Sequence, residues 1–502
     1  MVRATPLSGR CAPVDLSPED IRALGYQMVD RIADFYGSIR ERPVTPGEAP
    51  AVVRQALGDE SVPRHGMDAE RLLSLTADLL TEHSLFNGHP RFWGYITSSP
   101  TPIGALGDFL AAAINANSGA WQLSPMATEI ERQTVHWIAE MMGYPADCGG
   151  LLVSGGNMAN FVGFLAARKA QVSWDIRSEG LRAPEAGQLC VYTSKETHTW
   201  VEKAADLYGL GASAIRWIPT DDRLSMDTAA LRHQAAADRD AGKLPFLMVG
   251  TAGSVSTGAI DPLPELAAFC REQNLWFHVD GAYGGFAAML PDASSDLKGL
   301  SEADSVAVDP HKWLYAPLEA GCVLVRDPGH LRDAFSFHPP YYLMEGAQED
   351  PPTNFHDYGP QNSRGFRALK VWLALRQVGM DGYVRMISDD IELARHLYRC
   401  VDAHPELQAF TQGLSITTFR YVPQGVENEP YLNELNTELV QRIQASGEAF
   451  VSNAVINGAF LLRACVVNFR TTTEDIEALP EIVTRIGKEI HAEVRRPVAY
   501  RE

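Results

Sequence analysis

The sequence predicts an α/β fold built on a mostly parallel, doubly wound sheet. Between about residues 86 and 375, short apolar runs alternate with segments of helical periodicity such as 264–274. Strands that alternate with helices are typical of parallel sheets. The runs are apolar throughout, which indicates strands buried on both faces. The expected strands are 189–192, 214–218, 246–250, 276–280, 305–309 and 322–325.

Residues 1–85 predict an N-terminal helical arm. Ser17 is a suitable N-cap and Pro18 suits the first helical position. Apolar residues then recur at three- and four-residue steps on one helix face: Ile21, Leu24, Met28, Ile32 and Phe35. A Pro-rich linker (40–50) precedes a second apolar-periodic segment (72–80). Two such helices cannot bury their apolar faces alone, so we expect them to pack on the main body or on a partner chain.

The rest of the chain predicts two further domains, because 502 residues exceed the size of a single core. Residues 338–360 are rich in proline and polar side chains and have no periodicity, which is typical of a functional or disordered loop. The C-terminal part has a candidate strand at 460–469 and a final helix. We therefore expect a large domain (86–375) and a small α+β domain (376–502).

Composition and charge restrict the classes of function. The formal net charge of −20 disfavours nucleic acid and anionic membranes as partners. The seven cysteines are widely spaced and form no CxxC pair, so we expect no metal site and no disulfide framework. Neither a signal peptide nor an apolar run of membrane-spanning length is visible. These observations predict a soluble, cytoplasmic enzyme.

A lysine and an aspartate follow two of the expected strands. Asp280 ends FHVD (277–280), and Lys312 follows SVAVD (305–309) in the string DPHKW. Ligands in open α/β sheets bind outside the carboxyl ends of the strands. There a lysine can form a Schiff base with pyridoxal phosphate, and a carboxylate can keep the pyridine nitrogen protonated. Taken singly, Lys312 fits a surface lysine and Asp280 a strand cap equally well.

Three further segments place suitable groups after strands. The turn SGGN (154–157) leads from an apolar run into a helix, whose free N–H groups suit a phosphate. His198 follows the strand at 189–192, and Thr251 follows the run 246–250. Each alone also fits a plainer role: a tight turn, a core or surface histidine, and a local turn bond. Their order along the chain, completed by the aspartate and the lysine, predicts a pyridoxal-phosphate site.

Motifs over nearly the whole chain carry a resemblance to a known family. They are YQMVDRIADFY (26–36), HPRFWGYITSSPTPIGALGDFL (89–110), SPMATEIE (124–131), SGGNMAN (154–160), YTSKETHTWVEKA (192–204), GTAGSVSTGAID (250–261), HVDGAYGG (278–285), DPHKW (309–313) and SRGFRALKVW (363–372). The chain resembles the group II pyridoxal-phosphate-dependent decarboxylases, most closely the aromatic-L-amino-acid decarboxylases. The resemblance implies the aspartate-aminotransferase fold (fold type I) and a homodimer whose N-terminal arm wraps on the partner.

The resemblance also implies roles for residues around the cofactor. Lys312 matches the Schiff-base lysine, with His311 beside it. Asp280 matches the partner of the pyridinium nitrogen. Ala282 matches the small residue packed on the ring, and His198 matches the stacking histidine.

Four more positions match the cofactor site. Gly156, Asn157 and Asp309 correspond to residues around the phosphate, and Thr251 corresponds to a threonine beside the cofactor. Asp309 departs from the family pattern, because aromatic decarboxylases carry asparagine there. A carboxylate beside a phosphate is unfavourable, so Asp309 would be protonated or would turn to a neighbouring donor.

The resemblance assigns the last chemical step to a tyrosine on a mobile loop, which protonates the substrate's α-carbon after carbon dioxide leaves. The ungapped match is Tyr341, and a shift of one residue would make it Tyr342. Six residues match substrate-pocket positions: Tyr95, Ile96, Ser98, Asn117, Gly119 and Ser363. Asn117 and Gly119 replace larger apolar residues of the animal enzymes, and Ser363 is a hint toward tyrosine or dopa as the substrate.

The expected activity is decarboxylation of an L-amino acid, with an aromatic one favoured, to the amine and carbon dioxide. An aromatic aldehyde synthase is the nearest alternative, but such enzymes typically replace the loop tyrosine or the histidine, and Tyr341 and His198 are both present. Asn117 and Gly119 also leave open a non-aromatic substrate such as glutamate or 2,4-diaminobutyrate. An aminotransferase has no role for the loop tyrosine. The intact lysine, aspartate and histidine argue against a catalytically inactive homologue.

Overall fold

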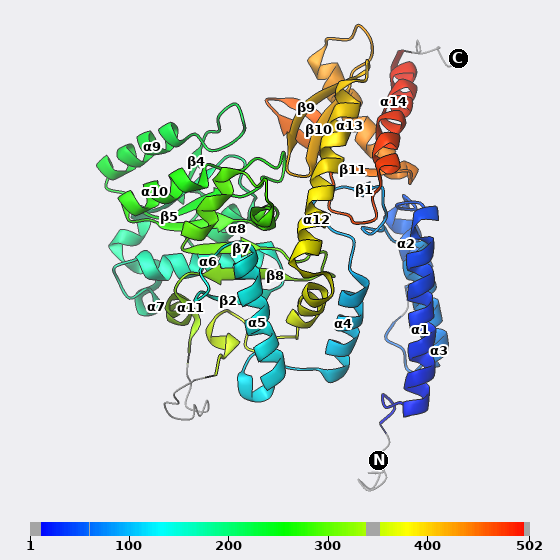
Figure 1. Cartoon of the computed structure of the whole chain (residues 1–502), viewed down its shortest axis with the longest axis horizontal. Helices are drawn as coiled ribbons and strands as arrows, with labels where there is room; N and C mark the ends of the chain where they lie inside the picture. Colours follow the sequence, from blue (N-terminus) through cyan, green and yellow to red (C-terminus); the bar gives the residue numbers. More distant parts are fainter. Residues whose placement is uncertain (1–11, 60, 338–351, 496–502) are drawn as a thin grey trace.

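The structure is a computed structural model that describes residues 12–59, 61–337 and 352–495. Figure 1 shows a large α/β region, a smaller sheet region formed mainly by the C-terminal part of the chain, and N-terminal helices that lie along one side of the molecule. The long helix α12 (Ala368–Asp402) runs from the large region to the small one. Within the described ranges, no helix is long and apolar enough to cross a membrane.

The large region is built on a seven-stranded sheet in the order β2-β8-β7-β6-β5-β3-β4. Its strands are β2 (Gly149–Val153), β3 (Leu189–Ser194), β4 (Ile215–Ile218), β5 (Leu244–Thr251), β6 (Trp276–Asp280), β7 (Ser305–Val308) and β8 (Gly321–Val325). All neighbouring pairs are parallel except those of β8, which is antiparallel to β2 and β7. The predicted α/β class and mostly parallel sheet are confirmed.

Helices cover both faces of this sheet. The helices of this region are α4 (Pro102–Ile114), α5 (Pro125–Met141), α6 (Gly156–Gln171), α7 (Ile176–Glu179), α8 (Trp200–Leu207), α9 (Thr228–Asp240), α10 (Leu263–Gln273), α11 (Pro328–Phe335) and the first part of α12. On one face, residues of α5, α9, α10 and α12 pack with strand residues such as Phe277 and Val279. On the other face, α6, α8 and α11 pack with Trp276 and Ala307. The strands are apolar throughout because both of their faces are buried.

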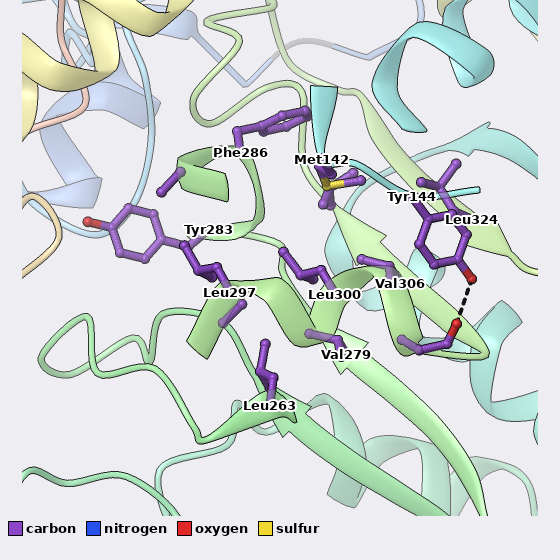
Figure 2. Packing of buried hydrophobic residues seen from close by; sticks show 14 of the residues in the cluster. Met142, Tyr144, Leu263, Val279, Tyr283, Phe286, Leu297, Leu300, Val306 and Leu324 are labelled. Atoms are coloured by element: carbon purple, nitrogen blue, oxygen red, sulfur yellow. Dashed lines mark hydrogen bonds between the residues drawn. The ribbon is translucent and has the colours of Figure 1, made fainter. Parts of the chain in front are cut away.

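The core on the first face extends beyond the strands. Figure 2 shows Val279 and Val306, from neighbouring strands, among Leu263, Leu297 and Leu300. Tyr144 also belongs to this cluster, and its hydroxyl donates to the Ala303 carbonyl over 3.0 Å. A buried tyrosine hydroxyl needs such a partner, because burying an unpaired polar group costs free energy. The packing gives β6 and β7 a rigid support behind their carboxyl ends.

The small region contains a five-stranded sheet in the order β1-β11-β12-β10-β9. Its elements are β1 (Phe92–Trp93), β9 (Leu407–Gly413), β10 (Ile416–Tyr421), β11 (Phe450–Ile456), β12 (Ala459–Cys465), α13 (Glu429–Ser446) and α14 (Thr473–Arg495). The strand predicted at 460–469 forms but ends at Cys465, because its partner β10 starts opposite that residue at Ile416. The remaining strands of this sheet were not predicted. The domain boundary at 375–376 stays a prediction, and α12 runs across it.

The predicted arm helices are confirmed. They are α1 (Pro18–Ser38), α3 (Ala69–Glu82) and, within the segment between them, the unpredicted α2 (Pro50–Leu57). The Ser17 hydroxyl accepts from the Asp20 N–H over 3.1 Å, as expected of an N-cap. Short 3-10 helices complete the fold: η2 (Ile39–Glu41), η3 (Trp121–Leu123), η4 (Gly180–Arg182), η5 (Pro184–Gln188), η6 (Ala212–Ala214), η7 (Gly285–Met289), η8 (Ser295–Glu302) and η9 (Phe355–Asp357).

Candidate active site

The carboxyl ends of three adjacent strands converge on one place. In the sheet register, Thr251 at the end of β5 lies opposite Asp280 at the end of β6, and Asp280 lies opposite Ala307 on β7. The chain that leaves β7 carries Asp309 and Lys312. Parallel strands bring their carboxyl ends to the same edge, so residues far apart in sequence become neighbours there.

Asp280 is buried and accepts two hydrogen bonds. Its Oδ2 accepts from the indole N–H of Trp200 over 2.8 Å, and its Oδ1 accepts from the backbone N–H of Ala282 over 3.1 Å. The side chain is 7 % exposed. Two donors stabilise a negative charge on the carboxylate at a fixed orientation. Trp200 had no role in the sequence prediction, although it lies inside the quoted motif at the start of α8.

Lys312 lies against a second carboxylate. Its Nζ is 3.1 Å from Oδ2 of Asp309, and Nε2 of His311 is 3.7 Å from the same oxygen. Asp309 is buried, and its Oδ1 has no hydrogen-bond partner among the described residues. Asp309 thus pairs with the neighbouring Lys312 amine through one of its two oxygens. Burial lowers the pKa of the His311 imidazole, while the charge of Asp309 opposes that shift.

The glycine turn of the SGGN motif lies directly beside these groups. It connects β2 to α6, and Gly155 has a φ of 138°, a conformation that favours glycine. A Cβ on Gly156 would lie 2.7 Å from Oδ2 of Asp309 and 3.2 Å from the Cβ of Ala282. A Cβ on Gly155 would lie 3.2 Å from Cε1 of His311. Only glycine thus allows the N-terminus of α6 to approach the chain segments that follow β6 and β7.

His198 interacts electrostatically with the same cluster. Its Nδ1 accepts from the backbone N–H of Trp200 over 3.3 Å. Desolvation lowers the pKa of the imidazole although the residue is exposed; Asp280 opposes the shift and Lys312 adds to it. A lowered pKa keeps the ring largely neutral near pH 7, so that it can present a flat apolar face.

Thr251 is fixed by a buried carboxylate. Its backbone N–H donates to Oδ2 of Asp261 over 2.8 Å, and the other oxygen of Asp261 accepts from the N–H of Met226. Burial raises the pKa of Asp261 to about 6. The hydroxyl of Thr251 lies 3.2 Å from that of Thr197. Asp261 organises this corner and was quoted in the sequence motif, but sequence reasoning gave it no role.

The six predicted pocket positions fall into two groups. Ser98 reaches the site, because its hydroxyl donates to the His311 carbonyl over 2.8 Å. Tyr95 and Ile96 precede it, and Tyr95 is 60 % exposed with a φ of 51°. The second group lies around Arg364: Asn117 accepts through Oδ1 from the N–H groups of Gly119 and Arg364, and Ser363 is the exposed neighbour of Arg364. In the described part of the chain, no hydrogen bond or ion pair joins this second group to Lys312.

Arg364 itself was not predicted. Its guanidinium forms a buried pair with Glu131 and also donates to the Leu152 carbonyl over 2.6 Å. The Glu131 carboxylate accepts from the Leu152 N–H over 2.9 Å. The pair thus ties α5 and the segment before α12 to strand β2. Tyr341 and Tyr342 lie outside the described residues.

Comparisons with known proteins identify the family of this chain. The sequence model of the pyridoxal-dependent decarboxylase conserved domain matches residues 50–422. The chain belongs to this family. Like the family, it uses pyridoxal phosphate and catalyses amino-acid decarboxylation.

Relatives and solved structures of this decarboxylase cover nearly its full length. It is 34% identical to an aromatic-L-amino-acid decarboxylase of Bacillus atrophaeus, over 95% of this chain and 97% of that protein. It is 30% identical to a phenylacetaldehyde synthase of Arabidopsis thaliana, over 91% of this chain and 94% of the relative. The crystal structure of Oryza sativa TDC with PLP and tryptamine superposes with a TM-score of 0.88 at 28% identity, covering 97% and 100% of the two chains. The fold is therefore that of the family, fold type I, as the resemblance implied.

Proposed function

We propose that this decarboxylase acts on aromatic L-amino acids and releases the amine and carbon dioxide. The observation that carries the chemistry of the proposal is that Asp280 ends β6 while Lys312 follows the adjacent strand β7; Trp200 binds Asp280, and Asp309 pairs with Lys312. The relative from Bacillus atrophaeus and the structure solved with tryptamine support an aromatic substrate.

In this proposal three parts of the site bind the cofactor. Lys312 would hold the aldehyde carbon of pyridoxal phosphate, and Asp280 would keep its pyridine nitrogen protonated. Gly156 and Asn157, at the N-terminus of α6, would supply backbone N–H groups to its phosphate. The fit is supported by the close approach at Gly156, which only the absence of a side chain allows, and by the two donors that stabilise charge on Asp280.

When bound, pyridoxal phosphate accepts the electron pair that the departing carboxylate leaves on the substrate. The surrounding residues orient the groups that take part. Ala282 would leave room for the ring, and the neutral imidazole of His198 would stack on it. His311 and Thr251 complete the wall around the cofactor. Asp309 lies between the phosphate turn and Lys312, where it orients the lysine amine.

The final proton goes to the substrate's α-carbon. We assign its delivery to the hydroxyl of Tyr341, with Tyr342 as the alternative one residue along the chain. The substrate pocket in this proposal is formed by six residues: Tyr95, Ile96, Ser98, Asn117, Gly119 and Ser363.

We propose that the enzyme works as a homodimer in the cytoplasm. Helices α1 and α3 contain no buried residue, although each has an apolar face. On α4, Leu106, Phe109, Leu110 and Ile114 are half or more exposed. Exposed apolar surface of this extent is typical of an interface. A partner subunit would also cover the exposed Tyr95. The free cysteines of the described chain support a reducing compartment.

A substrate screen tests the proposed activity. Purified protein is incubated with tyrosine, dopa, phenylalanine, tryptophan, glutamate and 2,4-diaminobutyrate, and carbon dioxide, amine, aldehyde and peroxide are measured separately. We expect carbon dioxide and amine in equal amounts from at least one aromatic substrate. Activity with glutamate or diaminobutyrate alone would contradict the aromatic proposal.

The same screen tests a second function, because the chain is also 30% identical to a phenylacetaldehyde synthase. Aldehyde and peroxide in place of amine would favour that activity. The control is Lys312→Ala, which should abolish every product.

A further inference from the structure

A buried chain of hydrogen bonds runs beneath the turn that opens α6. The indole N–H of Trp276 donates to the Ser305 hydroxyl over 2.8 Å, and that hydroxyl lies 2.7 Å from Nδ1 of His278. Nε2 of His278 lies 2.7 Å from Oδ1 of Asn160. Asn160 Nδ2 then donates to the Gly156 carbonyl over 2.9 Å. The chain joins β6 and β7 to the first residue of the helix.

The direction of these hydrogen bonds follows from the chemistry of the groups. An indole N–H can only donate, so the Ser305 oxygen accepts from Trp276 and can donate its own hydrogen to Nδ1 of His278. A neutral His278 then carries its proton on Nε2 and donates to Asn160 Oδ1. Burial lowers the pKa of His278 to about 4, which keeps the ring neutral. Asn160 is thereby oriented with its NH₂ group toward Gly156.

The packing around His278 leaves no free space in which its imidazole could move. His278 and Ser305 have no exposed surface, and Asn160 is 1 % exposed. On the next turn of α6, a Cβ on Gly163 would lie 2.7 Å from Cε1 of His278. The helix thus packs directly on the imidazole, and the size of this ring sets the distance between α6 and the sheet.

The hydrogen bond from Asn160 to the Gly156 carbonyl also affects the N–H group on the other side of the same peptide, that of Asn157. The peptide bond is planar and trans, so the Gly156 oxygen and the Asn157 N–H point in opposite directions. A hydrogen bond that draws the oxygen toward Asn160 therefore aims the Asn157 N–H out of the helix N-terminus. The Asp309 carboxylate lies beside this turn: its Oδ2 would be 2.7 Å from a Cβ on Gly156, and its Oδ1 is buried without a hydrogen-bond partner among the described residues.

We propose that His278 and Asn160 are positioning residues for the cofactor's phosphate. They orient the first peptide of α6, and through it they set the affinity for pyridoxal phosphate without contacting the cofactor. The inference rests on the proposed role of the Gly156–Asn157 turn in phosphate binding.

The test compares two ligands of the apoenzyme, pyridoxal phosphate and pyridoxal. Both can attach to Lys312, but only the first carries a phosphate. The ratio of their dissociation constants therefore measures the contribution of the phosphate-binding turn alone. Asn160→Asp keeps the size of the side chain and can still accept from His278, but it replaces the donor to Gly156 by an acceptor. We expect binding of pyridoxal phosphate to weaken about tenfold, as loss of one buried hydrogen bond implies, with pyridoxal binding unchanged.

A matched control is Asn436→Asp on α13. Asn436 is also buried, and its Nδ2 donates to a carbonyl four residues earlier, that of Leu432, over 2.8 Å. This control should lose stability but keep the wild-type ratio. Ser305→Ala is a milder second variant, useful where Asn160→Asp folds poorly; it removes the group that selects the His278 tautomer, and we expect a loss of about threefold in pyridoxal phosphate affinity.

The outcomes separate this inference from the function on which it rests. A wild-type ratio in both Asn160→Asp and Ser305→Ala would overturn the positioning role. Gly156→Ala tests the turn itself, because the added Cβ would meet Asp309. An unchanged ratio in Gly156→Ala would show that the phosphate binds elsewhere. A changed ratio there, with no change in the other two variants, would reject only the role of His278 and Asn160.

Discussion

The indole N–H of Trp200 donates to Oδ2 of Asp280 over 2.8 Å, across a sequence separation of 80 residues. Both groups are buried, and the second Asp280 oxygen is occupied by the Ala282 N–H. The carboxylate can therefore face a ligand in one orientation only. Trp200 begins α8, so the orientation of Asp280 depends on how that helix packs on the sheet.

The first prediction is that Trp200→Phe weakens catalysis more than cofactor binding. The variant keeps an aromatic ring but loses the donor, so Asp280 should be less well oriented and turnover should fall about tenfold. Asp280→Asn should cost far more, because an amide cannot keep the pyridine nitrogen protonated. Steady-state kinetics and a cofactor titration measure both effects. Equal turnover in Trp200→Phe and the wild type would contradict the role of this hydrogen bond.

A second prediction concerns Lys312. Lys312→Ala should lose the visible absorbance band that borohydride treatment abolishes in the wild type, together with nearly all turnover. The fold should survive, because the Lys312 side chain is partly exposed and contributes a single ion pair, the one to Asp309. Lys298→Ala, which changes an exposed lysine in η8, is the control. Normal turnover in Lys312→Ala would refute the assigned site.

Asp309→Asn should bind the cofactor more tightly than the wild type. The substitution removes a negative charge beside the proposed phosphate position and also frees Lys312 from its ion pair. A reduction of about tenfold in the dissociation constant of pyridoxal phosphate is reasonable for the loss of one such repulsion. Fluorescence titration of the apoenzyme measures it. Weaker binding would instead identify the Asp309 carboxylate as a required contact.

The proton donor can be located by a pair of variants. If Tyr341 protonates the α-carbon, Tyr341→Phe should still release carbon dioxide but form amine about 10²-fold more slowly. Product should shift toward aldehyde, ammonia and peroxide, because the unprotonated carbon remains open to oxygen. Tyr342→Phe is the matched comparison. A loss of amine only in Tyr342→Phe would move the role by one residue, and no change in either would exclude the loop tyrosines.

The last prediction is that the active enzyme is a dimer. Phe109→Glu places a charge on the exposed apolar face of α4, where Phe109 is 61 % exposed. It should weaken association at least tenfold while leaving the subunit folded. Leu207→Glu, on an exposed part of α8, is the control. Light scattering at several concentrations and parallel activity assays check this; a stable and active monomer of the wild type would contradict it.

The sequence by itself determined the fold class and most of the large sheet. Strand β6 was predicted with its observed bounds, and β3, β4, β5, β7 and β8 were predicted to within two residues at either end. Such strands are recognisable because burial of both faces leaves an unbroken apolar run. The N-cap at Ser17 could also be predicted from the sequence, because it depends only on residues within one helical turn. The family was also visible in short contiguous motifs.

Contacts between distant segments were decided only by the tertiary structure. The two-residue strand β1 is too short to carry a periodic signal, and it forms only because Phe92 and Trp93 pair with β11. The Trp200–Asp280 hydrogen bond and the Arg364–Glu131 pair join residues whose partners no local pattern specifies. Each of these polar groups is buried, and a buried polar group requires a partner. Which partner it finds depends on how the sheet and helices pack, and that packing is a property of the whole fold.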